Sequence, residues 1–282
     1  MLYNYIGDFM NIIELLKFLF LGFVQGITEP IPVSSSGHLL VFQSLIKGLD
    51  GIDYGLLATL TNFGSLCAIL IIFRDKIISL FKGFFGYLKN RDKKYYDDYK
   101  YCWYVVVATI PAGLVGIIVE KLGIFDFLEN NVRFVGLTLV ITAAFLYFIK
   151  DFKGMKDSKQ ITLKDSIIIG LFQMVALLPG ISRSGSTIVG GMLRSLKRDV
   201  AFDFSFILYI PISLATMVLG VKDLFEASLT GVQVFYYLVA TVMAFIFTYI
   251  GTKWFRNIVK NGKLIYFVIY CLVVGSLIII FF

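Results

Sequence analysis

The fold of this chain follows from one stretch of its sequence, Gly22-Phe-Val-Gln-Gly-Ile-Thr-Glu-Pro-Ile-Pro-Val-Ser-Ser-Ser-Gly-His38. This stretch lies within residues 18–46, where Glu29 is the only aspartate, glutamate, lysine or arginine. Pro30 and Pro32 interrupt this apolar segment near its centre, and proline breaks a helix because it lacks a backbone N–H group. The serines that follow also compete with helical hydrogen bonds. The stretch therefore predicts two half-helices that meet at a break inside a membrane.

The composition of the whole chain supports a membrane location. Of 282 residues, 58% are hydrophobic and 16% are charged, and the mean hydropathy is +0.84. A soluble domain carries about 25% charged residues, so a soluble globular protein is excluded, as are a disordered chain and a disulfide scaffold. Lipid admits helices or closed barrels, and the long continuous apolar runs favour helices. We predict an all-α polytopic membrane protein.

Six uncharged runs are long enough, or nearly so, to cross a bilayer as helices, which takes about 20 residues. These runs are 54–73, 101–119, 134–149, 204–221, 227–252 and 264–282. We therefore expect six spanning helices, all within one transmembrane domain that covers residues 1–282.

The charged residues indicate the orientation of these helices. Of 45 charged residues, 24 lie in the segments 74–100, 150–165 and 251–263, where basic residues exceed acidic ones by ten. Loops rich in lysine and arginine stay in the cytoplasm, so the basic charge indicates orientation and not nucleic-acid binding. With these three segments inside, single crossings place 120–133 and 222–233 outside, and both chain termini are predicted outside.

Two stretches, 1–53 and 166–203, must then cross the membrane an even number of times. Each contains a helix break, and a re-entrant helical hairpin satisfies the count. A shift of 148 residues aligns Ser34-Ser-Ser-Gly37 with Ser182-Arg-Ser-Gly185. We therefore predict six spanning helices plus two re-entrant hairpins, arranged as an inverted-topology repeat in which broken helices meet near the bilayer midplane. The halves are 1–150 and 151–282.

The few ionisable residues inside the membrane are candidates for function, because burying a charge in lipid is costly. Glu29 shares a helix face with Gln25, four residues earlier. His38, the only histidine of the chain, follows the serine-rich break and can move protons near neutral pH.

Arg183 is the matching cation, in the turn Pro179-Gly-Ile-Ser-Arg-Ser-Gly-Ser-Thr187. A guanidinium suits phosphate oxygens, and the stretch 185–193 is expected to offer a helix N-terminus with free amides. The first hairpin thus supplies a carboxylate, hydroxyls and an imidazole, and the second supplies a cation and amides. This division is typical of a phosphotransfer site. The alternative is that Arg183 only forms a structural ion pair with Glu29.

These residues resemble the motifs of the undecaprenyl-diphosphate phosphatase family, the bacitracin-resistance type of bacterial membrane phosphatase. The matching motifs are Gln25-Gly-Ile-Thr-Glu29, Pro32-Val-Ser-Ser-Ser-Gly-His38 and the turn Pro179–Thr187. The resemblance implies hydrolysis of undecaprenyl diphosphate to undecaprenyl phosphate and phosphate, which recycles the lipid carrier for peptidoglycan synthesis. It also implies the bacterial inner membrane, a site that opens to the outer face, and a divalent cation.

The resemblance also implies roles for individual residues. Glu29 is the acidic residue of the first motif, Ser35 the nucleophile, His38 its proton-transfer partner and Arg183 the diphosphate clamp. Ser35, His38 and water all stay open as the nucleophile. The residues expected to bind substrate or phosphate are Gln25, Ser34, Ser36, Gly180, Ser182, Ser184, Gly185, Ser186 and Thr187.

Two departures from the family pattern bear on the metal. Gln25 stands where some members have glutamate, and Ser36 stands where threonine is common. Glu29 is thus the single candidate protein ligand, and Mg²⁺ or Ca²⁺ is expected to be held mainly by the substrate diphosphate.

The expected partners are a polyprenyl diphosphate lipid and membrane lipids, with no nucleic acid; a homodimer stays open. The alternative function is a lipid-carrier transporter or flippase, because inverted repeats with broken helices are also a transporter plan.

Overall fold

The computed structural model describes residues 11–46, 52–123, 128, 131–227 and 229–282. This described part is helical and contains no strand, only an isolated bridge between Lys156 and Leu196. The helices are α1 (Ile12–Thr28), α2 (Ser35–Leu45), α3 (Tyr54–Ile72), α4 (Arg74–Asn90), η3 (Lys93–Tyr95), α5 (Tyr96–Lys121), α7 (Val132–Ile149), η4 (Ser158–Gln160), α8 (Leu163–Val175), α9 (Arg183–Leu193), α10 (Arg198–Glu226), α11 (Gly231–Lys260) and α12 (Ile265–Phe281). The predicted all-α class is confirmed.

Five described helices are long and apolar enough to cross a membrane, which makes this a multi-pass membrane protein. They are Tyr54–Ile72, Lys93–Lys121, Val132–Ile149, Arg198–Gly220 and Gly231–Lys260. The sixth predicted span corresponds to α12, an apolar helix of 17 residues. At 1.5 Å per residue this helix is about 25 Å long, a little less than the bilayer core. The sixth span stays a prediction.

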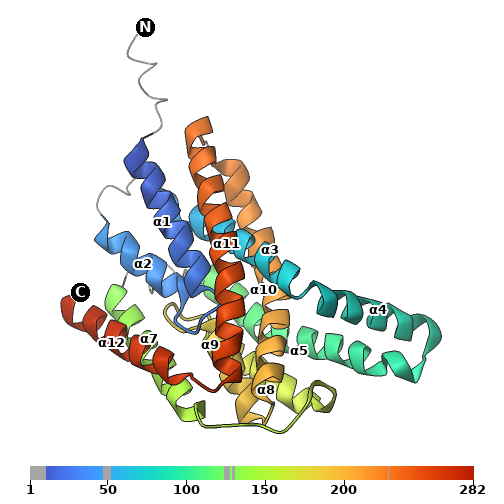
Figure 1. The fold of residues 1–282 in the computed structure, drawn as a ribbon. Coiled ribbons are helices and arrows are strands. Elements are labelled where there is room, and N and C mark those ends of the chain that lie inside the picture. Colours follow the sequence, from blue (N-terminus) through green and yellow to red (C-terminus); the bar gives the residue numbers. More distant parts are fainter. Residues whose placement is uncertain (1–10, 47–51, 124–127, 129–130, 228) are drawn as a thin grey trace.

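The charged segment 74–100 is a helical hairpin rather than an extended loop. Helix α4 follows α3 and ends at Asn90, and the left-handed φ of 53° at its C-cap, Arg91, turns the chain back toward α5. Figure 1 shows α4 and the first part of α5 projecting together from the remaining helices. Leu80 and Gly83 of α4 are buried in this hairpin.

Small residues allow α1 to pack closely along α11 (Figure 1). A Cβ atom on Gly22 would lie 2.3 Å from the Ala240 carbonyl oxygen, and one on Gly26 would lie 2.6 Å from that of Ala244. Both pairs are spaced four residues apart, the small-xxx-small arrangement of close membrane helices. Helix α8 packs along α5 in the same manner, since a Cβ atom on Gly170 would lie 2.7 Å from the Ala108 carbonyl oxygen. Both short helices therefore lie parallel to a long one.

The two helix breaks meet in the interior of the molecule. A Cβ on Gly37, in the first turn of α2, would lie 3.0 Å from the Gly180 Cα of the other break. Helix α7 holds the second break, because Thr138 Oγ1 donates to the Pro179 carbonyl at 2.7 Å and Thr142 Oγ1 donates to the Gly180 carbonyl at 3.3 Å. The fold thus brings two residues that are 143 positions apart in the sequence close together.

Candidate active site

A serine caps the helix that follows each break. Ser34 Oγ accepts from the Gly37 amide at 3.3 Å at the start of α2, and Ser182 Oγ accepts from the Gly185 amide at 3.1 Å at the start of α9. These side chains satisfy amides that the helix leaves unpaired. Ser34 does so with a φ of 66°, a backbone conformation that costs about 1–3 kcal/mol and tends to occur at functional sites.

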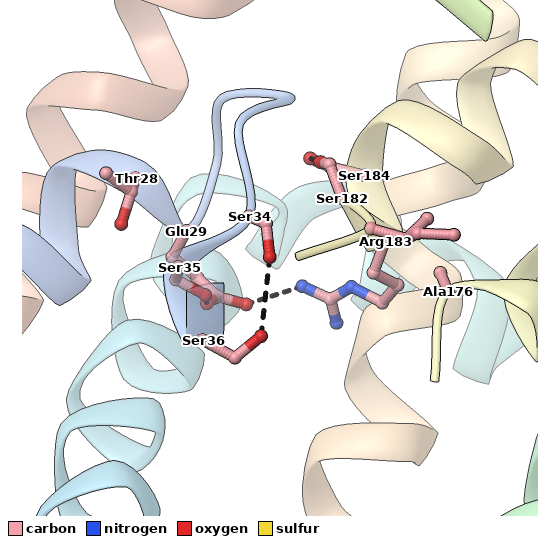
Figure 2. A pocket seen from close by; sticks show the side chains of 10 residues that line it. Thr28, Glu29, Ser34, Ser35, Ser36, Ala176, Ser182, Arg183 and Ser184 are labelled. Atoms are coloured by element: carbon pink, nitrogen blue, oxygen red, sulfur yellow. Dashed lines mark hydrogen bonds and ion pairs between the residues drawn. The ribbon is translucent and has the colours of Figure 1, made fainter. Parts of the chain in front are cut away.

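The first turns of α2 and α9 enclose a small polar cavity of about 70 Å³ (Figure 2). The lining residues are Thr28, Glu29, Ser34, Ser35, Ser36, Ala176, Ile181, Ser182, Arg183 and Ser184. Most of them carry a hydroxyl, and among the described lining residues Glu29 is the only carboxylate and Arg183 the only cation. The cavity therefore suits a polar, anionic group.

Glu29 is the centre of the polar contacts. Its Oε1 accepts from Arg183 Nη2 at 2.6 Å, and its Oε2 accepts from Gln25 Nε2 at 2.9 Å and from the Ser35 hydroxyl. The carboxylate is 11% exposed and the guanidinium side chain 20% exposed. Three donors, one of them a paired cation, compensate the cost of burying this charge. Ser35, the predicted nucleophile, is thus hydrogen-bonded to a carboxylate.

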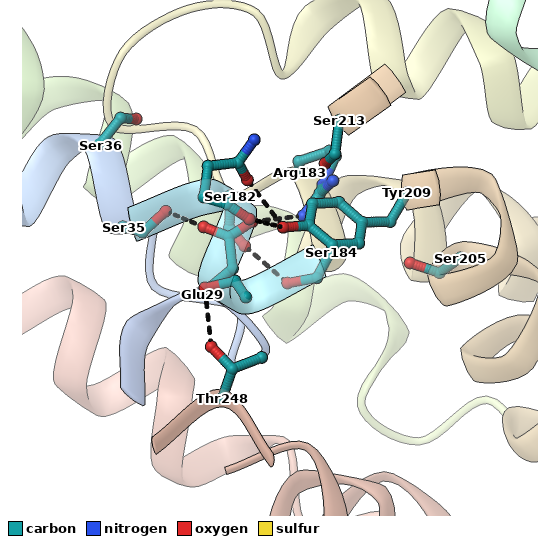
Figure 3. A network of polar contacts seen from close by, with 12 residues as sticks. Glu29, Ser35, Ser36, Ser182, Arg183, Ser184, Ser205, Tyr209, Ser213 and Thr248 are labelled. Carbon is teal, nitrogen blue, oxygen red and sulfur yellow. Dashed lines mark hydrogen bonds and ion pairs between the residues drawn. The ribbon is translucent and has the colours of Figure 1, made fainter. Parts of the chain in front are cut away.

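Arg183 contacts a residue that sequence reasoning missed. Its guanidinium carbon lies 3.8 Å from the centroid of the Tyr209 ring, which comes from α10 (Figure 3). Nothing in the sequence distinguished Tyr209 within the apolar run 204–221, since the chain has 16 tyrosines. Its proximity to Arg183 depends on how α9 packs against α10.

His38 is buried and held away from Ser35 by other partners. Its Nδ1 donates to the Ser34 carbonyl at 2.8 Å, because a carbonyl only accepts, and its Nε2 is 2.7 Å from the Tyr270 hydroxyl of α12. Within the described part of the chain, no hydrogen bond joins His38 to Ser35. The proton-transfer role of His38 stays a prediction, and Tyr270 is a second residue that sequence reasoning missed.

The other predicted phosphate-binding residues fall into two groups. Ser34, Ser36, Ser182 and Ser184 line the cavity, and Gln25 contacts it through Glu29. The remaining four residues belong to the frame around it. Gly180 turns the chain with a φ of 88°, Gly185 donates to the cap, Thr187 lies 2.6 Å from the Ser205 hydroxyl, and Ser186 is buried on α9.

The start of α9 differs from the expectation. The helix begins at Arg183 rather than at 185, and the Gly185 amide is used by the Ser182 cap. The Gly185 amide is therefore not available to an anion, and the Arg183 side chain and the serine hydroxyls are donors that line the cavity.

The residues present do not form a metal centre of their own. Among the described residues no group of three or more histidine, cysteine, aspartate or glutamate side chains lies close enough to hold an ion. Glu29, the single candidate ligand, already accepts from Gln25, Ser35 and Arg183.

The fold and the site together define a class: an all-helical, multi-pass membrane protein with a compact polar site between two helix breaks. Residues 18–277 match the family model described as bacitracin resistance protein BacA. The chain belongs to this family.

Curated relatives match the chain over nearly its whole length. The chain is 41% identical to undecaprenyl-diphosphatase 1 of Bacillus licheniformis, over 96% of this chain and 100% of that protein. It is 43% identical to undecaprenyl-diphosphatase 2 of Bacillus thuringiensis, over 95% and 97%. It is 41% identical to the undecaprenyl-diphosphatase of Oceanobacillus iheyensis, over 97% and 98%. The resemblance seen in the sequence motifs is confirmed.

Proposed function

We propose that this chain is an undecaprenyl-diphosphatase, an enzyme that hydrolyses undecaprenyl diphosphate to undecaprenyl phosphate and inorganic phosphate. This reaction recycles the lipid carrier for peptidoglycan synthesis and gives resistance to bacitracin. One observation carries the proposal: the Ser35 hydroxyl donates to Glu29 directly opposite Arg183, inside a cavity lined by hydroxyls. A nucleophile, a proton acceptor and a phosphate-binding cation thus lie within one small site.

The chemistry follows from these contacts. Ser35 Oγ attacks the terminal phosphorus while its proton passes to Glu29 Oε2. The bond between that phosphorus and the bridging oxygen breaks, and its electron pair leaves with undecaprenyl phosphate. Water then hydrolyses the serine phosphate, restoring the hydroxyl and releasing inorganic phosphate. Proton transfer by a positioned group contributes about 10²–10⁴-fold in rate.

Arg183 stabilises negative charge on the phosphate oxygens during this transfer. Its paired carboxylate becomes neutral when Glu29 takes the proton, which leaves the guanidinium free to bind the anion. His38 as the proton acceptor, or as the nucleophile, stays the alternative, and the Tyr270 contact gives the imidazole a defined orientation for either role.

We also propose that the two halves, 1–150 and 151–282, form an inverted repeat within the single domain 1–282. The 148-residue shift that relates the motifs relates α2 to α9 and the contact glycine Gly22 to Gly170. A Cβ atom added to Gly136 of α7 would lie 2.8 Å from the Gly275 carbonyl oxygen of α12, and one added to Gly275 would lie 2.7 Å from that of Gly136, as expected for equivalent helices that meet at a symmetry axis.

The direction of packing supports the inversion. Contacts of Asn62 with Tyr209 and of Phe73 with Phe202 make α3 antiparallel to α10. Helices α1, α11 and α3 run parallel to one another. Helices α8, α5 and α10 also run parallel to one another. The two hairpins then enter from opposite faces of the membrane, with six spanning helices between and after them.

For location, we propose the bacterial inner membrane, with the basic segments in the cytoplasm and the site open to the outer face. Both termini are then external; residues 1–10 lie outside the described part. The proposed divalent cation, Mg²⁺ or Ca²⁺, arrives with the diphosphate, whose oxygens supply most of its ligands. A homodimer also stays a prediction.

The test is phosphate release from the purified protein given undecaprenyl diphosphate. We expect release by the parent and a fall of about 10²–10⁴-fold in kcat for Glu29→Gln, which keeps the size and shape of the side chain and removes the base. If Glu29→Gln keeps its rate while His38→Ala loses it, His38 is the proton acceptor. Headgroup movement across sealed vesicles without phosphate release would instead indicate a transporter and contradict the proposal.

A further inference from the structure

The Arg183 guanidinium is held by two contacts of different kinds. One of its N–H groups, on Nη2, donates to Glu29 Oε1 at 2.6 Å, and its face lies over the Tyr209 ring, 3.8 Å from the centroid (Figure 3). A cation over an aromatic face is attracted by the ring quadrupole, most strongly where the pair is desolvated. Tyr209 is 2% exposed, so this contact is shielded from solvent.

A contact on the face leaves the edges of the guanidinium available. Its five N–H donors lie in the guanidinium plane, and the ring beneath them accepts none of their hydrogen bonds. Arg183 also lines the polar cavity beside the serine hydroxyls (Figure 2). The aromatic ring therefore holds the cation in place while donors stay available for an anion in the cavity.

Tyr209 is itself anchored across two spanning helices. Its hydroxyl donates to Asn62 Oδ1 at 2.7 Å, which ties α10 to α3. The amide of Asn62 is oriented in turn, because its Nδ2 donates to Thr216 Oγ1 at 3.4 Å. The ring position is thus set by the transmembrane framework and not by the hairpin that carries Arg183.

The proposed reaction requires such a support. When Glu29 accepts the Ser35 proton, its attraction for Arg183 weakens, whereas the contact with an uncharged ring persists. We propose that Tyr209, held by Asn62, is a positioning residue that fixes the Arg183 guanidinium so that its N–H groups bind the diphosphate oxygens of the substrate. This inference rests on the function proposed above.

The experiment uses the purified full-length protein and two substitutions of Tyr209. We expect Tyr209→Leu, which removes the ring, to lower kcat/KM for undecaprenyl diphosphate about tenfold, mainly through KM. Tyr209→Phe keeps the ring and loses the hydroxyl, so we expect a fall of less than about threefold. A Tyr209→Leu protein with the parent's kcat/KM overturns the proposal.

A double-mutant cycle tests whether Tyr209 acts through Arg183. Lysine keeps the charge but has no planar group to lie on the ring, so in an Arg183→Lys background we expect Tyr209→Leu to cost less than about threefold. An undiminished tenfold loss in that background shows that Tyr209 acts elsewhere and overturns the proposal.

The matched control is Tyr101→Leu, another buried tyrosine, with Lys76 Nζ 4.9 Å from its ring centroid. We expect its kcat/KM to stay within about twofold of the parent, since it contacts no residue of the site.

If Tyr209→Leu melts well below this control, Asn62→Ala is used in place of Tyr209→Leu. That variant keeps the ring and frees the hydroxyl, so, as for Tyr209→Phe, we expect a fall of about two- to threefold that shrinks with Arg183→Lys; no fall overturns the proposal.

A binding readout separates this inference from the proposed function. Inorganic diphosphate is expected to raise the melting temperature of the parent, and Tyr209→Leu to need about tenfold more for the same rise. If the parent releases no phosphate but this difference appears, the proposed function fails and the positioning role is supported. If the parent hydrolyses substrate and Tyr209→Leu binds diphosphate equally well, only the positioning role fails.

Discussion

The two helix breaks have the same backbone plan and carry different chemistry. Each is followed by a helix of 11 residues that a serine caps, and in each the cap hydroxyl lies near a second serine, Ser34 near Ser36 and Ser182 near Ser184. The first residue of the helix is Ser35 in one and Arg183 in the other. The fold thus supplies two similar helix ends that face one cavity, and the residue at one position determines that one end presents a hydroxyl and the other a cation.

The largest expected effect comes from removing either the Ser35 hydroxyl or the Arg183 guanidinium. We expect Ser35→Ala and Arg183→Ala each to lower kcat for phosphate release by about 10³-fold or more, because one removes the attacking group and the other the charge that stabilises the transferring phosphate. Ser44→Ala, also on α2 but at its exposed end, is the control and is expected to keep the parent rate. A Ser35→Ala protein that keeps its rate would mean that water or His38 attacks.

The first turns of α1 and α8, with which the two hairpins begin, differ in buried charge. Helix α1 begins after a neutral cap, Asn11, whereas the first turn of α8 contains the fully buried Asp165, which pairs with Lys156 at 3.0 Å and Arg194 at 2.8 Å. We expect Asp165→Asn to lower the free energy of unfolding by about 3 kcal/mol, because it leaves two cations without their partner. Thermal melting in detergent at pH 7 measures this loss.

The pH dependence of that loss follows from the carboxyl pKa. Burial opposes ionisation of Asp165, but hydrogen bonds from Lys156, Thr162 and Arg194 outweigh it and lower the pKa below the usual value. A lowered pKa contributes stability that is complete above the unfolded value, about 3.9, and is lost as pH falls through the folded value. The difference between parent and Asp165→Asn is therefore expected to persist down to about pH 4 and to shrink only below it. A difference that vanishes by pH 6 would contradict this.

The glycines that seat each hairpin provide a matched pair. We expect Gly22→Val and Gly170→Val each to destabilise the protein by about 1–3 kcal/mol, since an added side chain meets the backbone of the facing helix. Gly113→Ala, where an added Cβ meets nothing within 4 Å, is expected to be neutral or slightly stabilising. If one glycine tolerates valine and the other does not, the two hairpins are not equivalently packed.

The smallest expected effect concerns the two caps. Ser182→Ala is expected to cost about 1 kcal/mol of stability through the lost cap. Ser34→Gly loses the equivalent cap, but glycine adopts the positive φ of this position without strain. We therefore expect Ser34→Gly to be about 1 kcal/mol more stable than Ser34→Ala. Melting temperatures of the three variants measure the difference, and equal values for Ser34→Gly and Ser34→Ala would show that the φ carries no strain.

Parts of the site were accessible to sequence reasoning because charge is rare in this chain. Glu29 and Arg183 stood out as ionisable residues within apolar segments, and the serine-rich motifs placed Ser35 beside them. The segment 74–100 was less predictable, because high charge indicates a location outside the membrane but does not exclude a helix. Tyr209 and Tyr270 gave no signal, since an aromatic residue in a spanning helix has the same local pattern whether it faces lipid or a buried cation.

The amino-acid sequence alone determined that this is a helical membrane protein, where its helices break and which family it resembles, because continuous apolar runs, prolines and charge asymmetry act locally along the chain. Only the tertiary structure decided which partners these groups meet. In the folded protein Glu29 accepts hydrogen bonds from Ser35 and Arg183, and His38 contacts Tyr270. The face of the Arg183 guanidinium lies over the Tyr209 ring. These pairings join residues from different helices, and side-chain packing between helices, rather than any local propensity, sets their distances.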